Sequence, residues 1–213
     1  MEDPKFLTYK NVVLRRSDLQ SLEDQNYLND TVIDFYFVHL SVYYQYDEIL
    51  LIPTSVSFLL ANAIDLDSFT STIKSLDLQK KKLIFFTVNN DNSHWSLFVY
   101  CRKRNLFMHY DSVNQVNCKL AFSIYESLND YIIHDSAKFM ECLAPKQRNW
   151  YDCGLYVMEI SRVICECYSN VDRFRNEEKD GICESVDCNY VEFDMRSKLL
   201  GLILKMKNEE IKP

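Results

Sequence analysis

Hydrophobic positions follow a helical pattern at first, change to the pattern of strands in the middle, and become helical again toward the C-terminus. Over Asn29–Tyr44, apolar side chains cover most of the helix circumference, which predicts a largely buried helix with Asn29 or Asp30 as its N-cap. Two shorter helices are predicted over Pro53–Ile64 and Asp67–Leu76, because Pro and Asp favour the start of a helix.

The middle of the chain contains short runs of β-branched and aromatic residues, which are typical of strands. Four strands are predicted, over Leu83–Val88, His94–Cys101, Asn105–Asp111 and Lys138–Leu143. Helical spacing is found over Asn117–Ile132, Cys153–Tyr168 and Val191–Lys207. Helices that flank a central group of strands indicate an α+β fold.

The composition favours one folded domain over residues 1–213. A chain of 213 residues with 47% hydrophobic residues can bury one good core. With only 3 Gly and 4 Pro and no repeat at a fixed period, long linkers are not expected. The net charge of −7 argues against a nucleic acid partner and favours a basic one.

The protein is expected to be located in the cytoplasm, the nucleus or both. Met1–Leu14 lacks the basic and apolar segments of a leader, and no stretch approaches 18 consecutive apolar residues, so no membrane association is expected. Its eight cysteines are therefore interpreted as reduced thiols, most of them small core residues.

One cysteine differs from the others in its setting. Cys153 follows the polar segment 147–152 and starts an apolar helix, where unpaired backbone N–H groups and the helix dipole favour a thiolate. Gly154 comes next and leaves room for a substrate backbone to approach closely. Cys153 is therefore the candidate nucleophile.

A thiolate nucleophile needs a base, and His94 is the first candidate among four histidines. His39 lies inside an apolar helix and His134 follows a helix end, whereas His94 opens a strand after the polar loop Asn89–Ser93. His109 is the rival candidate.

The geometry of a hairpin favours His94 over His109. If the turn is centred between Arg102 and Lys103, His94 lies directly opposite Asp111, and His109 lies opposite Ser96. Opposed residues have Cβ atoms roughly 4.5–5.5 Å apart, which suits a carboxylate that orients an imidazole.

Four blocks of the sequence resemble the Ulp/sentrin-specific cysteine proteases, and within that family the small deneddylase branch. They are Leu28-Asn29-Asp30, His94-Trp95-Ser96-Leu97, His109-Tyr110-Asp111-Ser112, and Gln147 with Asp152-Cys153-Gly154. The resemblance implies a papain-like fold of a single Ulp-type protease domain, with a central mixed sheet flanked by helices.

The resemblance also implies roles for residues around His94, Asp111 and Cys153. Gln147 would supply a side-chain N–H to the oxyanion, beside the backbone N–H of Cys153. Trp95 would roof a tunnel for the Gly-Gly tail of the substrate, and Asp30 would meet the tail just before the glycines. Asn29 and Gly154, from the same blocks, are expected beside the substrate.

The implied reaction is cleavage after the C-terminal Gly-Gly of a ubiquitin-like modifier, either from conjugates or from a precursor. Cys153 attacks the terminal glycine carbonyl, His94 protonates the departing amine, and water hydrolyses the thioester. No metal and no cofactor are expected. The expected partners are a Nedd-type modifier and its conjugates, such as neddylated cullins, and the protein is expected to be a monomer.

Three alternatives remain open. Tyr27 stands where the deneddylase branch usually has Trp, and the loop before His94 is short, so a SUMO-specific protease is one alternative. A zinc site is another, although its cysteines lack paired knuckles. The third is an inactive modifier-binding module on the same fold. The cysteines of the zinc alternative are Cys165, Cys167, Cys183 and Cys188.

Overall fold

The computed structural model describes residues 3–62, 66–90, 93–132, 137–169 and 184–210. Its centre is a five-stranded mixed sheet with the strand order β3-β4-β5-β6-β7. The two outer pairs, β3 with β4 and β6 with β7, are parallel, and the inner pairs are antiparallel. The strands are β3 (Ile49–Leu51), β4 (Leu83–Asn90), β5 (His94–Cys101), β6 (Leu106–Tyr110) and β7 (Lys138–Glu141).

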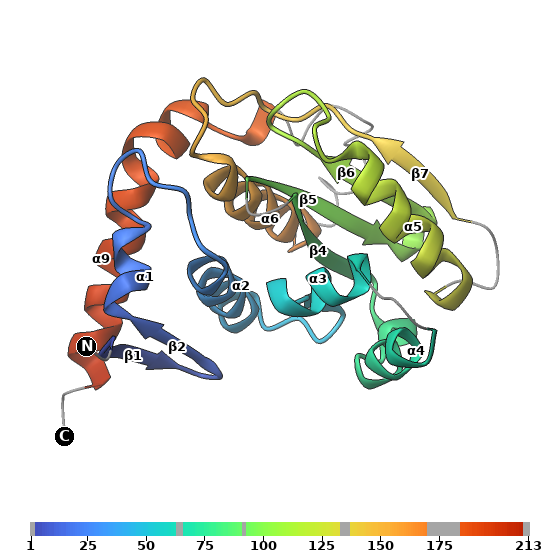
Figure 1. Cartoon of the computed structure of the whole chain (residues 1–213), viewed down its shortest axis with the longest axis horizontal. Helices are drawn as coiled ribbons and strands as arrows, with labels where there is room; N and C mark the ends of the chain where they lie inside the picture. Colours follow the sequence, from blue (N-terminus) through green and yellow to red (C-terminus); the bar gives the residue numbers. More distant parts are fainter. Residues whose placement is uncertain (1–2, 63–65, 91–92, 133–136, 170–183, 211–213) are drawn as a thin grey trace.

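Helices cover both faces of this sheet, and each face has its own hydrophobic cluster (Figure 1). Because side chains alternate along a strand, Phe85 of β4 enters one cluster and its neighbour Phe86 the other. On the Phe85 face lie α2 (Asp30–Tyr44) and α6 (Cys153–Ser169), and on the Phe86 face lie α3 (Thr54–Ala61), α4 (Leu66–Ser75) and α5 (Cys118–Ile132). The α+β fold class is thus confirmed.

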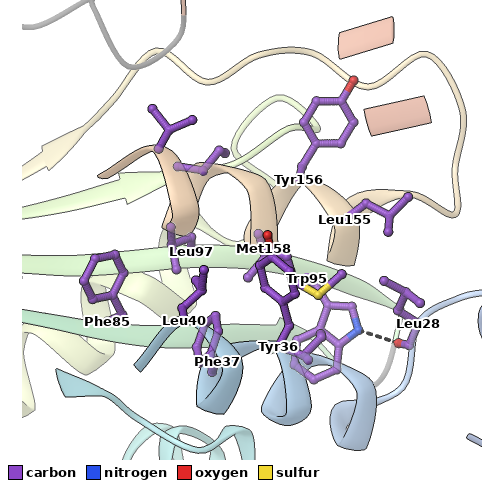
Figure 2. Close-up of a cluster of buried hydrophobic side chains, with 14 of the residues drawn as sticks. Leu28, Tyr36, Phe37, Leu40, Phe85, Trp95, Leu97, Leu155, Tyr156 and Met158 are labelled. Atoms are coloured by element: carbon purple, nitrogen blue, oxygen red, sulfur yellow. Dashed lines mark hydrogen bonds between the residues drawn. The ribbon is translucent and has the colours of Figure 1, made fainter. Parts of the chain in front are cut away.

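The Phe85 face holds the layer from which the site is built (Figure 2). Leu155 and Met158 of α6 pack in the same cluster as Tyr36 and Leu40 of α2 and the sheet residue Leu97. All five are buried. This packing holds α6 in place against the sheet. It therefore fixes the position of the first residue of α6 relative to the sheet.

The first and last described elements of the chain lie together beside α2 and share its hydrophobic cluster (Figure 1). The N-terminal strands β1 (Lys5–Tyr9) and β2 (Val12–Arg15) form an antiparallel hairpin. The short helix α1 (Arg16–Gln20) comes directly after this hairpin. A π-helical turn over Tyr190–Asp194 leads into the last helix, α9 (Met195–Glu210), which packs against β1. None of the described helices is both long and apolar enough to cross a membrane.

The predicted strands and main helices are present, with bounds shifted by a few residues. The hairpin, α1 and the three-residue strand β3 were not predicted. Val12–Arg15 alternates buried and exposed positions but is only four residues long, too short for a clear period in the sequence.

The predicted register of the β5–β6 hairpin is wrong. Leu97 pairs with Tyr110 and Cys101 with Leu106, because the turn includes a 3₁₀ segment over Arg102–Arg104 and a left-handed Asn105 with a φ of 48°. The centre of the turn therefore moves by one residue toward the C-terminus. His109 lies opposite Phe98 rather than Ser96.

This shift leaves the faces of the strands unchanged. Moving the turn centre by one residue changes each pairing partner by two positions, and side chains repeat with a period of two. His94 and Asp111 therefore remain on one face, as diagonal neighbours rather than as an opposed pair.

Candidate active site

Cys153 is the first residue of α6, and its side chain is fully buried. Its sulfur accepts a hydrogen bond of 3.4 Å from the backbone N–H of Trp95 on β5. The sulfur thus receives an N–H donor from the sheet at the end of the helix where the dipole favours negative charge.

His94 opens β5 and meets Asp111, which directly follows β6. The His94 Nε2 atom lies 2.7 Å from Asp111 Oδ1, and both side chains are buried. Backbone N–H groups of Val113 and Asn117 donate to the same carboxylate, at 2.8 and 3.0 Å. Asp111 is therefore fixed in place by three donors.

These contacts set the charges of the pair. Burial alone would lower the pKa of His94, but its hydrogen bonds with Asp111 and with the sulfur of Cys153 raise the pKa to about 9. Burial likewise favours neutral Asp111, yet the hydrogen bonds from His94 and the backbone hold the pKa of Asp111 below its usual value. Near neutral pH, the pair is thus an imidazolium and a carboxylate.

The structure brings Cys153, His94 and Asp111 together in one chain of contacts. Asp111 binds Nε2 of His94, so Nδ1 is the ring nitrogen that remains for the sulfur of Cys153. A thiol with an adjacent imidazole, which is itself oriented by a carboxylate, is an arrangement for nucleophilic catalysis.

The rival histidine, His109, has other partners. Its Nε2 lies 2.9 Å from the hydroxyl oxygen of Ser96, and its Nδ1 lies against the carboxylate of Glu141. The ring of His109 is fully buried. Both ring nitrogens are therefore occupied by residues other than Cys153.

Asn117 is a residue that the sequence marked only as a helix start. Its backbone N–H binds Asp111, and its side-chain amide donates to the carbonyl of His94 at 3.1 Å and to the hydroxyl of Ser96 at 3.0 Å. Asn117 thus contacts both members of the pair, Asp111 through its backbone and His94 through its side chain, and holds them together. Its position six residues after Asp111 gave no signal without the fold.

Gln147 lies in the segment that leads to Cys153, and both the oxygen and the nitrogen of its side-chain amide are hydrogen-bonded. Its Oε1 accepts from the Ser112 hydroxyl at 2.6 Å, and its Nε2 donates to the carbonyl of Asn149 at 2.7 Å. The amide has a second N–H, which is the one that could serve an oxyanion. That role stays a prediction.

A cavity of about 470 Å³ opens beside Trp95. Asp30 is exposed and is the charged residue among its described lining residues. Phe58 and Leu59 of α3 supply large apolar side chains that are more than half exposed. The lining residues are Asp30, Thr54, Ser55, Phe58, Leu59, Ala61, Thr87, Asn89 and Trp95.

Asn29 and Asp30 have different tasks at the start of α2. The Asn29 side chain is the N-cap, accepting from the backbone N–H of Val32 at 3.0 Å, and its amide donates to Asp18. Asp30 is not the cap: its Oδ1 accepts from the backbone N–H of Thr31 at 2.8 Å, and the residue lines the cavity. The predicted contact of Asn29 with substrate stays a prediction.

Trp95 and Gly154 are both in contact with Leu28. The indole N–H of Trp95 donates to the carbonyl of Leu28 at 3.0 Å (Figure 2). A Cβ added to Gly154 would come within 3.0 Å of the Cβ of Leu28. The missing side chain of Gly154 thus allows α6 to pack against Leu28, and its expected role beside the substrate stays a prediction.

The cysteines of the alternative zinc site are only partly described. Cys183 lies outside the described residues, and Cys165 and Cys167 are buried on α6. Burial raises the pKa of Cys165 to about 12, which disfavours the thiolate that zinc requires. Among the residues that the structure describes, no group of three or more His, Cys, Asp or Glu side chains could hold a metal ion.

Comparisons with known sequences point to one family. Residues 61–190 match the Ulp1 protease family, C-terminal catalytic domain. NEDD8-specific protease 1 from Arabidopsis thaliana is 34% identical over 225 aligned positions, which cover 99% of this chain and 97% of the relative. Sentrin-specific protease 8 from Homo sapiens is 31% identical over 175 positions, covering 77% of this chain and 82% of the relative.

Solved structures share the fold. The C-terminal Ulp1 protease domain in complex with Smt3, the yeast ortholog of SUMO, has a TM-score of 0.70 with 21% identity, covering 97% of this chain and 89% of that one. A de-sumoylating protease has a TM-score of 0.75 with 19% identity, covering 98% and 96%. These structures confirm the predicted fold.

Proposed function

The chain belongs to the Ulp1 protease family, and from this premise we propose that it is a thiol protease that cleaves after the C-terminal Gly-Gly of a Nedd-type modifier. The proposal covers release of the modifier from conjugates and processing of its precursor. In both reactions the same glycine carbonyl is attacked, and only the departing amine differs.

The observation that carries this proposal is the chain of contacts from Asp111 through His94 to Cys153. The thiolate of Cys153 attacks the glycine carbonyl, and the His94 imidazolium gives its proton to the amine that departs. His94 then takes a proton from the water that hydrolyses the thioester. Gln147 and the backbone N–H of Cys153 would stabilise the oxyanion.

The lining of the cavity beside Trp95 suits a substrate tail that has a basic residue and apolar residues before its two glycines. Asp30 supplies a negative charge at the cavity, and Phe58 and Leu59 supply apolar surface. The tail of Nedd-type proteins carries an arginine before Gly-Gly, and SUMO tails lack it. Relatives at more than 30% identity include a NEDD8-specific protease and a sentrin-specific protease, whereas the SUMO proteases among the solved structures are 21% and 19% identical.

Conjugates such as neddylated cullins are proposed as substrates on the same grounds, with the enzyme acting as a monomer. A cytoplasmic or nuclear location is also proposed. It is supported by the cysteines, because the seven within the described residues are free thiols, as expected in a reducing compartment.

Probes with an electrophile in place of the terminal glycine carboxylate test the proposal. Nedd-type, SUMO and ubiquitin probes are incubated separately with the protein, and adducts are located by mass spectrometry. We expect a covalent adduct at Cys153, formed fastest with the Nedd-type probe. If none of the three probes forms an adduct, the protein is a modifier-binding module and not a protease. If the SUMO probe reacts fastest, the SUMO-specific alternative is favoured.

A further inference from the structure

Arg196 on α9 uses all three of its guanidinium nitrogens to bind two separate segments of the chain. It lies next to the π-helical turn, one residue after the start of the helix. Its side chain is mostly buried, with 11% of its surface exposed. Neither the sequence pattern nor the family blocks identified this residue.

The first of the two segments leads directly to Cys153. Arg196 Nη2 and Nε lie 2.6 and 3.1 Å from Oδ1 of Asp152, the residue before the nucleophile. The Asp152 side chain is 1% exposed, and its other oxygen accepts from Asn149. The guanidinium also lies over the ring of Tyr151, with its central carbon 5.6 Å from the ring centroid.

The second segment leads to the cavity. Nη1 of Arg196 donates to the carbonyls of Ser21 and Glu23 at 2.9 and 3.0 Å, and Nη2 donates to the carbonyl of Asn26 at 2.8 Å. Residues 27–30 follow at once and bring Leu28 against Trp95 and Gly154, and Asp30 to the cavity.

We propose that Arg196 is a positioning residue that locks the segment before Cys153 and the segment before Asp30 into one arrangement. It touches no reacting atom, so it acts through Asp152 and through the backbone of 21–26. Only a planar guanidinium offers five donors in a fixed geometry, whereas a lysine at this position has one nitrogen for both segments.

The proposal has a distinct kinetic consequence, because the two segments serve different steps. Loss of the Asp152 contact leaves a buried carboxylate without its cation beside the thiolate, which should slow attack. Loss of the carbonyl contacts frees the segment that carries Asp30, which should weaken binding of the modifier. An arginine that only stabilised the fold would lower the unfolding temperature without changing either parameter in the folded protein.

The test compares Arg196→Gln, Arg196→Lys and Asp152→Asn with the parent. Lys198→Gln is the matched control, because Lys198 is an exposed cation on the same helix. The kcat and KM values are measured with a Nedd-type modifier carrying a C-terminal fluorophore, at a temperature where far-UV circular dichroism shows each variant to be folded. The rate of Cys153 alkylation by iodoacetamide is followed by mass spectrometry of the Cys153 peptide.

We expect Arg196→Gln to lower kcat about tenfold or more and to raise KM about threefold or more, with Arg196→Lys restoring neither fully. Asp152→Asn should lower kcat alone, and Lys198→Gln should match the parent. Values of kcat and KM within twofold of the parent in Arg196→Gln would overturn the proposal. If Arg196→Gln does not fold, an unchanged kcat in Asp152→Asn overturns it.

The inference rests on the proposed function for its substrate, but the alkylation measurement does not. If the parent cleaves no modifier, the proposed function fails, and slower alkylation of Cys153 in Arg196→Gln still supports the positioning role. Equal alkylation rates in the parent and in Arg196→Gln count against that role.

Discussion

At the scale of single residues, the candidate site depends on how strongly each reactive side chain is held. Asp111 receives three hydrogen bonds, and Asn117 binds Asp111 through its backbone N–H and the carbonyl of His94 through its side-chain amide. The sequence could single out Cys153, His94 and Asp111 as candidates, because each begins or ends a predicted helix or strand. It could not predict Asn117 or Arg196, because their value depends on partners that only the fold brings near.

Replacing the nucleophile separates chemistry from binding. Cys153→Ala should abolish turnover of a Nedd-type substrate and leave its binding within about twofold of the parent, because the cavity keeps all its lining residues. Turnover is measured by fluorophore release and binding by calorimetry. Measurable turnover above the buffer rate in Cys153→Ala would contradict the assignment of the nucleophile.

The raised pKa of His94 predicts the alkaline limit of activity. Because the pKa in the folded protein is about 9, against 6.5 for a free histidine, the imidazolium persists through neutral pH. It is lost as the pH rises through about 9, so kcat/KM should fall there. The stability from its pair with Asp111 is likewise complete below about pH 6.5 and lost as the pH rises toward 9.

Asp111→Asn tests the cause of that limit. Removing the carboxylate removes one contact that raises the His94 pKa, so the alkaline fall in kcat/KM should move to lower pH. The rate at neutral pH should drop by roughly 10²–10⁴-fold, since the amide introduced in Asp111→Asn also holds the His94 ring in the wrong tautomer. An alkaline limb at the same pH in parent and variant would show that His94 is not the group that titrates.

Asp30 should decide which tails are accepted. Asp30→Ala should lower kcat/KM roughly tenfold for a tail with arginine before Gly-Gly, because a charge-assisted hydrogen bond is lost. The same variant should leave the rate with a SUMO tail nearly unchanged. Glu126→Ala, an exposed acidic residue on α5, is the control for net charge. Equal losses with both tails would remove Asp30 from the specificity argument.

At the scale of elements, hydrophobic periodicity was sufficient for long helices and central strands and failed for short ones. The helix over Asp30–Tyr44 and its Asn29 cap follow the pattern of the sequence. β3 has three residues, too few to show a period, and it joins the sheet through its parallel pairing with β4. The register of β5 and β6 failed for another reason, because the 3₁₀ turn with left-handed Asn105 has no clear sequence signal.

The cap of α2 offers a prediction at this scale. Asn29→Ala removes the acceptor for the Val32 N–H and the donor to Asp18, so it should lower the free energy of unfolding by about 1 kcal/mol or more. Urea unfolding followed by circular dichroism measures this change. Ser41→Ala on the same helix is the control, since its hydroxyl bonds only to a helix carbonyl. Similar small losses in both variants would argue against Asn29 as a strong cap.

At the scale of the whole molecule, the reactive groups meet where the start of helix α6 lies beside the start of strand β5 and the end of strand β6. Cys153 comes from α6, His94 from β5 and Asp111 from the residue after β6, so the sheet fixes two groups and the layer above it the third. The sequence predicted the members of these layers. It could not predict that α9 returns to the N-terminal segments, because that contact joins residues about 170 positions apart.

The architecture also predicts independence from metal ions. Since the proposed chemistry uses a thiolate and an imidazolium, dialysis against EDTA should leave kcat/KM within about twofold of the untreated protein, while iodoacetamide abolishes activity. Atomic emission spectroscopy of the purified protein gives the zinc content directly. Loss of activity with EDTA and recovery with zinc would revive the cysteine-rich alternative.

The indole of Trp95 also gives the protein a built-in optical reporter. The chain has two tryptophans, of which Trp95 is 8% exposed and hydrogen-bonded to Leu28, whereas Trp150 is 76% exposed. Trp150→Phe would leave Trp95 as the single tryptophan, and the backbone N–H of Trp95 contacts the sulfur of Cys153. Its fluorescence should respond when a tail fills the cavity, so arrival of the substrate could be timed by stopped flow without attaching any label.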